Sequence, residues 1–233
     1  MSIRPCCPGR KLTLPVWLLG FPAVCQGVLV DFRHAWERIE TWLREQRCTG
    51  ALSELHPPAS GEVVQSLQAA IPYPLHPHLV QWLRIHGGAP LYDAPIWPGG
   101  FVPYDVEVLK GGPEYMEEML EEFNEQRDED PERWILDRWA DPLWLPIAGT
   151  NTGESLLIDH RPGDTYGNII EIDYEGNEVT AVRWKHLGEM VSLMAESLES
   201  GSPMPYSRQY TRVPQLDEGP PRSLNWKLEK IQD

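Results

Sequence analysis

Four short apolar runs follow one another late in the chain: WLPIAG at 144–149, SLLID at 155–159, NIIEID at 168–173 and VTAVRW at 179–184. Runs of this length, bounded by Gly, Asp, Asn and Thr, are typical of β-strands. The DYEGNE segment before the fourth run offers Gly and Asn for the positive φ angles of a hairpin turn. Together these runs predict a small, mainly antiparallel sheet.

Three amphipathic helices are predicted before the sheet. Residues 31–47 carry apolar side chains at helical spacing between charged ones. A second helix is expected after Ser60, which can cap it, and Pro77 suits the first turn of a third. Gly87, at the end of WLRIHGG, is expected to take the left-handed conformation that closes this third helix. The expected apolar face of the second helix comprises Val63, Val64, Leu67 and Ala70.

Two more helices complete the pattern. Residues 113–126 have Tyr115, Met119, Leu120 and Phe123 at helical spacing, with glutamates over the remaining surface. The segment HLGEMVSLMAESLESG at 186–201 is expected to form a last amphipathic helix that stops at Gly201. Helices, an antiparallel sheet and a final helix predict an α+β fold, in which a small, mainly antiparallel sheet is flanked by helices.

The segment GTNTGES at 149–155 resembles a phosphate-binding loop, which reads G-x-x-x-x-G-K-[ST]. The spacing from Gly149 to Gly153 is one residue short, and Glu154 stands where the Lys is required. An apolar strand also follows, although a phosphate loop needs a helix there. The segment is therefore predicted to be a hairpin turn without nucleotide binding, and Glu154 is expected to face solvent or a partner.

Acidic residues dominate the chain, whose formal net charge is −15 over 233 residues. The excess is local, since residues 105–141 hold 14 acidic and four basic side chains, a net charge of −10. Nucleic-acid binding depends on clustered Lys and Arg, so this distribution argues against nucleic acid and favours a basic protein partner. A helix face that only keeps the chain solvated is the alternative explanation.

No motif in the sequence demands catalysis. G-x-S-x-G, H-E-x-x-H and G-x-G-x-x-G are all absent. His76 and His78 are two residues apart, whereas a metal pair on a helix would be spaced by three or four. Asp159 and His160 end the second strand, where exposed polar residues are expected anyway. We predict no catalytic residue, no metal and no cofactor; paired carboxylates of a hydrolase stay open, because one sequence cannot place them across a cleft.

Three segments are expected along the chain. Residues 1–30 form a leader, either disordered or ahead of the true start, whose apolar run partly resembles a secretory signal and is too short to span a bilayer. Residues 31–200 form the domain, and residues 201–233 form a C-terminal tail, partly extended around Trp226. The four cysteines lie in the first fifth of the chain and show no metal-site spacing. Reduced thiols and a cytoplasmic location are therefore expected.

Several motifs occur in a characteristic order: PPAS at 57–60, YPLHPHL at 73–79, WLPIA at 144–148, a Gly-then-acidic hairpin at 153–159 and a strand at 168–173. In this order they resemble the SUKH superfamily over about residues 31–200. That group includes yeast cell-wall assembly regulators linked to killer-toxin resistance and many bacterial immunity proteins. Two departures, Pro72 in place of a glycine and His86 where Asn or Asp is usual, affect capping more than the fold.

The resemblance implies a non-catalytic α+β domain, and many bacterial members neutralise a cognate toxin, often a nuclease. Such a toxin presents a basic surface that an acidic face can approach and cover. The leading hypothesis is a cytoplasmic immunity protein with a basic protein partner and no nucleic-acid or membrane ligand. The alternative is a regulatory scaffold that binds endogenous proteins. The expected partner-binding residues are Glu117, Glu118, Glu121, Glu122, Glu125, Asp128, Glu129, Asp130 and Glu154.

Overall fold

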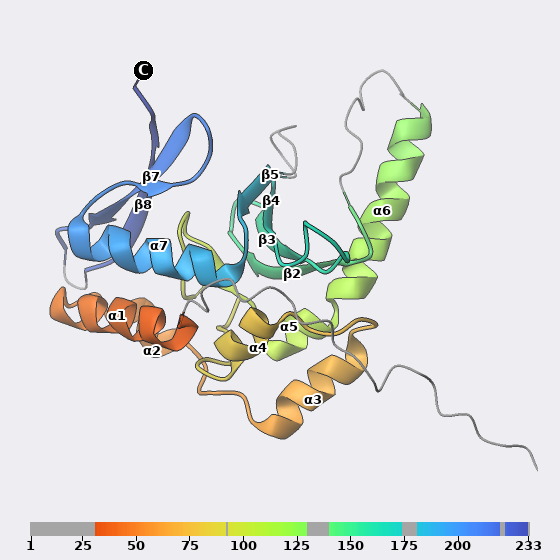
Figure 1. Ribbon diagram of the computed structural model, residues 1–233, viewed down its shortest axis with the longest axis horizontal. Helices are drawn as coiled ribbons and strands as arrows, with labels where there is room; N and C mark the ends of the chain where they lie inside the picture. Colours follow the sequence, from red (N-terminus) through yellow and green to blue (C-terminus); the bar gives the residue numbers. More distant parts are fainter. Residues whose placement is uncertain (1–30, 92, 130–139, 174–180, 220–221, 233) are drawn as a thin grey trace, which may run out of the picture.

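The computed structural model describes residues 31–91, 93–129, 140–173, 181–219 and 222–232. At its centre lies a five-stranded antiparallel sheet whose strands follow one another in chain order (Figure 1). The predicted α+β class is confirmed. The strand at Val102–Pro103 was not predicted, because its two residues are too few to show the alternating apolar pattern of a strand. The strands are β1 (Val102–Pro103), β2 (Trp144–Gly149), β3 (Glu154–Asp159), β4 (Ile169–Asp173) and β5 (Ala181–Trp184).

The GTNTGES segment is a hairpin turn, as predicted. Residues 150–153 connect β2 to β3, which pair antiparallel with Gly149 opposite Ser155. Gly153 has a φ of +98°, a conformation that glycine adopts without steric cost. Glu154 is the first residue of β3, so its carboxylate stands at the edge of the turn.

Seven helices lie within the described residues. Asp31 caps the first, accepting the His34 N–H at 3.1 Å, and Ser60 caps the third, accepting the Val63 N–H at 3.3 Å. Both caps satisfy helix donors that have no partner inside the helix. The helices are α1 (Phe32–Glu45), α2 (Gly50–Glu54), α3 (Gly61–Ala70), α4 (Pro77–Leu83), α5 (Val106–Lys110), α6 (Gly112–Glu129) and α7 (Leu187–Ser200).

The expected apolar face of α3 is too wide. Val64 and Leu67 are buried, but Val63 and Ala70 are exposed. The reason is that α3 lies at the surface and contacts the rest of the molecule mainly along α5 (Figure 1). A narrow contact needs only one apolar stripe.

The expected left-handed cap at Gly87 is wrong. α4 ends earlier, at Leu83, and its capping residue Arg84 keeps right-handed angles. The neighbouring Gly88 takes the left-handed conformation instead, with a φ of +94°. A Cβ on Gly88 would lie 2.3 Å from the carbonyl oxygen of Tyr104, so the chain requires a glycine there for two reasons.

Both faces of the central sheet are covered. On one face, side chains such as Leu156 and Ile158 join the main core with α1, α4 and α7. On the other face, Leu157 joins a smaller cluster with Met116 of α6. Side chains alternate between the two faces along β3, as a strand buried on both sides requires.

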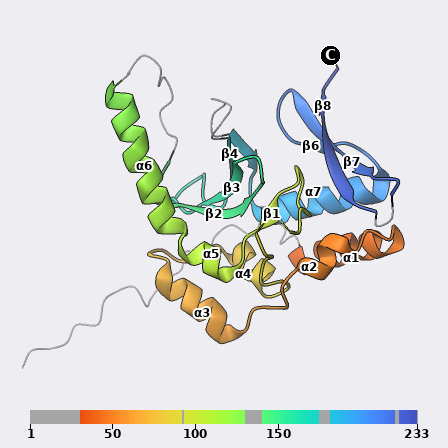
Figure 2. The ribbon, with the colours of Figure 1, turned by 180° about the vertical axis from the view of Figure 1, so that it is seen from behind.

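A second, three-stranded antiparallel sheet follows α7 (Figure 2). Met204, Tyr206 and Trp226 from this region belong to the main core, and α7 contacts two of the three strands. We therefore propose that the folded unit extends past the expected boundary at residue 200. The strands are β6 (Met204–Pro205), β7 (Tyr210–Leu216) and β8 (Leu224–Lys230).

Several expectations lie outside the described residues, namely those for the leader at 1–30 and for most of the DYEGNE turn. Of the cysteines, Cys48 is described, and it is buried with a free thiol. Within the described ranges, every helix is too short or too polar to cross a bilayer.

Candidate protein-binding surface

α6 is anchored at its first turns and then projects away from the sheet (Figures 1 and 2). Met116 is fully buried against the sheet, and Met119 and Leu120 pack on the same cluster. Tyr115, expected on the packing face, is instead 38% exposed, because Met116 occupies the position that faces the sheet. The side chain of Phe123 lies outside the described part of the helix.

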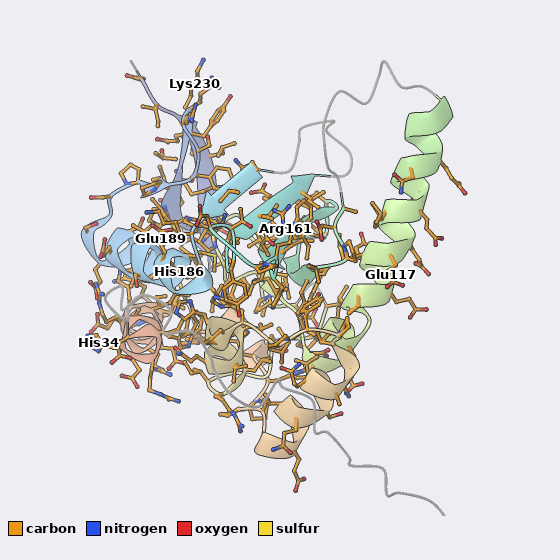
Figure 3. All side chains as sticks on the ribbon, turned by 45° about the vertical axis from the view of Figure 1, so that its right-hand side comes forward. His34, Glu117, Arg161, His186, Glu189 and Lys230 are labelled. Carbon is orange, nitrogen blue, oxygen red and sulfur yellow. The ribbon has the colours of Figure 1, made fainter. Side chains whose placement is uncertain are left out.

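The glutamates predicted for partner binding cover the solvent side of this helix. Glu117 is labelled on α6 in Figure 3. The backbone of Asp128 and Glu129 continues the helix, but their side chains are not described, and Asp130 lies outside the described residues. The exposed side chains are those of Glu117, Glu118, Glu121, Glu122 and Glu125, which we call the acidic face.

Helical spacing divides the acidic face into two ridges. Tyr115, Glu118 and Glu122 are separated by three and four residues, so they line one flank, the Tyr115 ridge. Glu117 and Glu121 are four residues apart and line the opposite flank, the Glu117 ridge. The 18 residues of α6 extend about 27 Å, long enough for a partner to contact several turns.

A groove of about 460 Å³, the α6 groove, lies where α6 begins. It opens beside the Tyr115 ridge, and the β2–β3 hairpin forms its other side. Two of its apolar side chains are accessible, since Leu91 is 44% exposed and Tyr115 is 38% exposed. The lining residues used below are Leu91, Tyr104, Val108, Tyr115, Pro146 and Glu154.

Glu154 is held in place by the hairpin turn. Its Oε2 accepts hydrogen bonds from the hydroxyl of Thr150 and, at 2.5 Å, from that of Thr152. Burial raises the pKa of Glu154, but these hydrogen bonds outweigh it, and the pKa falls below its ordinary value. Arg212 nearby lowers it further. The groove therefore contains one ordered, ionised carboxylate.

The structure thus brings Glu154 and the first turns of α6 together, although about forty residues separate them in sequence. The sequence predicted each of these residues as partner-binding for its charge alone. It did not predict the groove, because Leu91, Tyr104 and Pro146 come from three separate segments and carry no common pattern.

Four histidines meet on the side of the molecule where α4 and α7 begin. The rings of His76 and His78 meet edge to face with centroids 5.1 Å apart, and those of His78 and His186 do so at 4.7 Å. The backbone N–H of His76 donates to His160 Nε2 at 3.2 Å. Among the described residues, no group of three His, Cys, Asp or Glu side chains is arranged to hold a metal ion.

The expectation that Asp159 and His160 lie at an exposed strand end is wrong. Asp159 is fully buried and pairs with Arg161 at 2.6 Å, and that guanidinium also lies 5.2 Å from the ring centroid of Trp144. His160 is buried as well, and its Nδ1–H donates to the Ile158 carbonyl at 3.1 Å. The next loop folds back over the end of β3, so these polar side chains are enclosed and paired.

Comparison with known proteins gives a family and two distant relatives. The model of the SMI1 / KNR4 family (SUKH-1) matches residues 58–193, more than half of the chain. The chain is 30% identical over 96 residues to a glucan synthesis regulatory protein of Neurospora crassa, covering 40% of this chain and 18% of that protein. It is 29% identical over 147 residues to an ATP synthase lysine N-methyltransferase of Mus musculus, covering 57% and 54%. The chain thus spans under a fifth of one relative and about half of the other.

Proposed function

Because the chain belongs to the SMI1/KNR4 (SUKH-1) family, we propose that it is a non-catalytic protein-binding domain, an immunity protein that neutralises a cognate toxin. The family includes immunity proteins and cell-wall regulators, and it implies protein partners. The partner we propose is a basic protein, for example a nuclease.

The observation that carries this proposal is the acidic face on a helix that projects from the molecule (Figure 3). A row of like charges on one exposed helix concentrates negative potential where a partner can approach without obstruction. Enzymes that act on nucleic acid present basic surfaces to phosphate, so their substrate-binding side matches this face. Charge complementarity of this kind raises the association rate and fixes orientation.

The proposal includes a cytoplasmic location and the absence of an enzymatic activity. A protein that neutralises a nuclease has to meet it in the compartment where nucleic acid is exposed. The likeness to a methyltransferase gives a direct check. We expect no transfer of methyl groups from S-adenosylmethionine to basic proteins, and turnover that single Glu→Gln substitutions abolish would overturn the non-catalytic proposal.

A second candidate is a regulatory scaffold for endogenous proteins, and the likeness to the glucan synthesis regulatory protein favours it. Such a scaffold would use the same domain with several partners. The two candidates differ in what the chain retains and in whether it protects a cell.

Affinity capture from a lysate of the source cells, at low and at moderate salt, separates the candidates. For an immunity protein we expect one basic protein that is lost at moderate salt. Expressing that protein alone should arrest growth, and co-expressing this chain should restore it. Several non-toxic endogenous proteins, retained irrespective of salt, would support the scaffold and contradict the immunity proposal.

A further inference from the structure

The α6 groove contains apolar surface that the fold leaves accessible. The described residues expose seven large apolar side chains, and two of them, Leu91 and Tyr115, line this one groove. Exposed apolar side chains are common singly, but a pair lining one concavity beside a charged face is typical of an interaction site. A volume of about 460 Å³ lies in the range of pockets that hold small ligands, roughly 300–1,000 Å³.

Glu154 adds a specific polar group to this apolar surface. Both threonine hydroxyls donate to the same oxygen, Oε2. Within the described residues no hydrogen bond reaches the other oxygen, Oε1, so it can accept one from a ligand. A carboxylate already fixed by its neighbours loses little side-chain entropy on binding, which favours affinity. An ionised carboxylate selects a cation as the group that pairs with it.

We propose that the α6 groove anchors the basic partner by taking one large apolar side chain and an adjacent Lys or Arg, whose cation pairs with Glu154. The apolar side chain lies between Leu91 and Tyr115. This inference rests on the proposed function for the identity of the partner. Contacts in the α6 groove then contribute most of the binding free energy, and the acidic face steers the partner toward the groove.

The position of the groove determines along which side of α6 the partner lies. The groove opens beside the Tyr115 ridge, which continues into Glu118 and Glu122. A partner anchored in the groove therefore runs along this ridge, while the Glu117 ridge faces away from it. Charge changes on the two ridges should differ in their effect on binding, although they change the net charge equally.

The test uses the blocked dipeptide N-acetyl-Phe-Lys-amide and NMR of the backbone amides of the full chain. We expect saturable shifts near Leu91, Tyr115 and Glu154, with a dissociation constant on the order of 1 mM. N-acetyl-Phe-Glu-amide and N-acetyl-Gly-Lys-amide should each bind at least about fivefold more weakly, because each lacks one of the two contacts. No saturation by the Phe-Lys probe up to about 20 mM, or equal binding of all three, would overturn the inference.

Two variants locate the contacts. Glu154→Gln keeps the shape of the side chain and removes its charge, so it should abolish the preference for Phe-Lys over Phe-Glu. Leu91→Ser should weaken both Phe probes, whereas the matched change Val63→Ser, at an exposed apolar side chain on α3, should change neither. Equal effects of Leu91→Ser and Val63→Ser would contradict a site in the groove.

Failure of this inference is distinguishable from failure of the proposed function. If the dipeptide does not bind but charge reversal on α6 prevents capture of a basic protein, only the groove assignment is lost. If the dipeptide binds at the groove but no basic protein is captured, the groove stands and the immunity proposal falls.

Discussion

His78 and His186 stack edge to face with ring centroids 4.7 Å apart, and each accepts a backbone N–H through Nδ1. His186 caps α7 through the Glu189 N–H, and His76 caps α4 through the His78 N–H. A histidine can accept these bonds only when the nitrogen is unprotonated. Burial, together with neighbouring imidazoles, lowers the pKa of His76 to about 3 and that of His78 to about 4. This cluster makes the fold sensitive to acid.

We predict that the free energy of unfolding is highest above about pH 6.5 and falls as the pH drops from there toward 4. The unfolded chain gains protons on these histidines in that window, whereas the folded chain keeps them neutral. For His160, whose pKa burial lowers to about 4, the loss between pH 7.5 and pH 5 is on the order of 2 kcal/mol. Urea denaturation at pH 7.5 and at pH 5 measures it.

The control for this prediction is His186→Asn, which keeps a capping acceptor but does not titrate. Burial lowers the pKa of His186 even though Glu189 opposes the shift, so the substitution should flatten the pH dependence. Stability that does not change between pH 7.5 and pH 5 in the unsubstituted chain would contradict the role given to the cluster.

The buried carboxylate of Glu171 on β4 connects the two sheets. It accepts hydrogen bonds from Arg183 Nε at 2.8 Å and from the Tyr206 hydroxyl, and the Arg183 and Arg212 guanidinium groups lie 4.2 and 4.4 Å from the centroid of the Tyr206 ring. Glu171→Ala leaves two partly buried cations without their anion, so we predict a loss of on the order of 3 kcal/mol in unfolding free energy. Thermal unfolding measures it, with the exposed Glu196→Ala as control.

Tyr206→Phe in the same network should cost about 2 kcal/mol, less than Glu171→Ala, because it removes the hydrogen bonds of the hydroxyl with Glu171 and Arg212 and keeps the ring between the two guanidinium groups. If Glu171→Ala were no more harmful than Glu196→Ala, the three-stranded sheet would not be held by this network, and its place in the folded unit would be in question.

Gly149 is required by the close approach of Tyr104. A Cβ at this position would lie 2.2 Å from the Tyr104 hydroxyl oxygen. Gly149→Ala should therefore destabilise the protein by about 1–3 kcal/mol and displace a side chain that lines the α6 groove. Gly50→Ala is the matched control, since a Cβ on Gly50 meets no atom within 4 Å. Equal unfolding free energies for the two variants would show that Tyr104 leaves room for a side chain at position 149.

The parts of the fold that depend on local sequence were predictable. The helix cap at Ser60 and the strand pattern of residues 144–159 act through near neighbours, and the structure confirms them. The left-handed glycine after α4 was misplaced by one residue, because Tyr104, a distant residue, decides which glycine can be accommodated. Sequence periodicity carries no information on such contacts.

The candidate site was likewise predictable only where it depends on local sequence. The acidic face of α6 was predictable, since helical spacing and charge are both local properties. The α6 groove and the histidine cluster were not, because each is assembled from segments that meet only after the chain folds. His76 and His78 carried a spacing that argued against a metal site and gave no sign of the two other histidines.

We propose that the acidic face of α6 binds a basic protein. This binding is tested by the association rate of the captured partner with a variant in which Glu117, Glu118, Glu121 and Glu125 are changed to Lys. The control reverses four exposed glutamates elsewhere, Glu37, Glu45, Glu54 and Glu218, which changes the net charge by the same amount. The rate is measured at several salt concentrations.

We predict that the α6 variant associates at least about tenfold more slowly at low salt and loses most of its salt dependence, while the control variant changes far less. Equal slowing of both variants would mean that only net charge matters, and an unchanged rate for the α6 variant would show that the acidic face is not the binding surface.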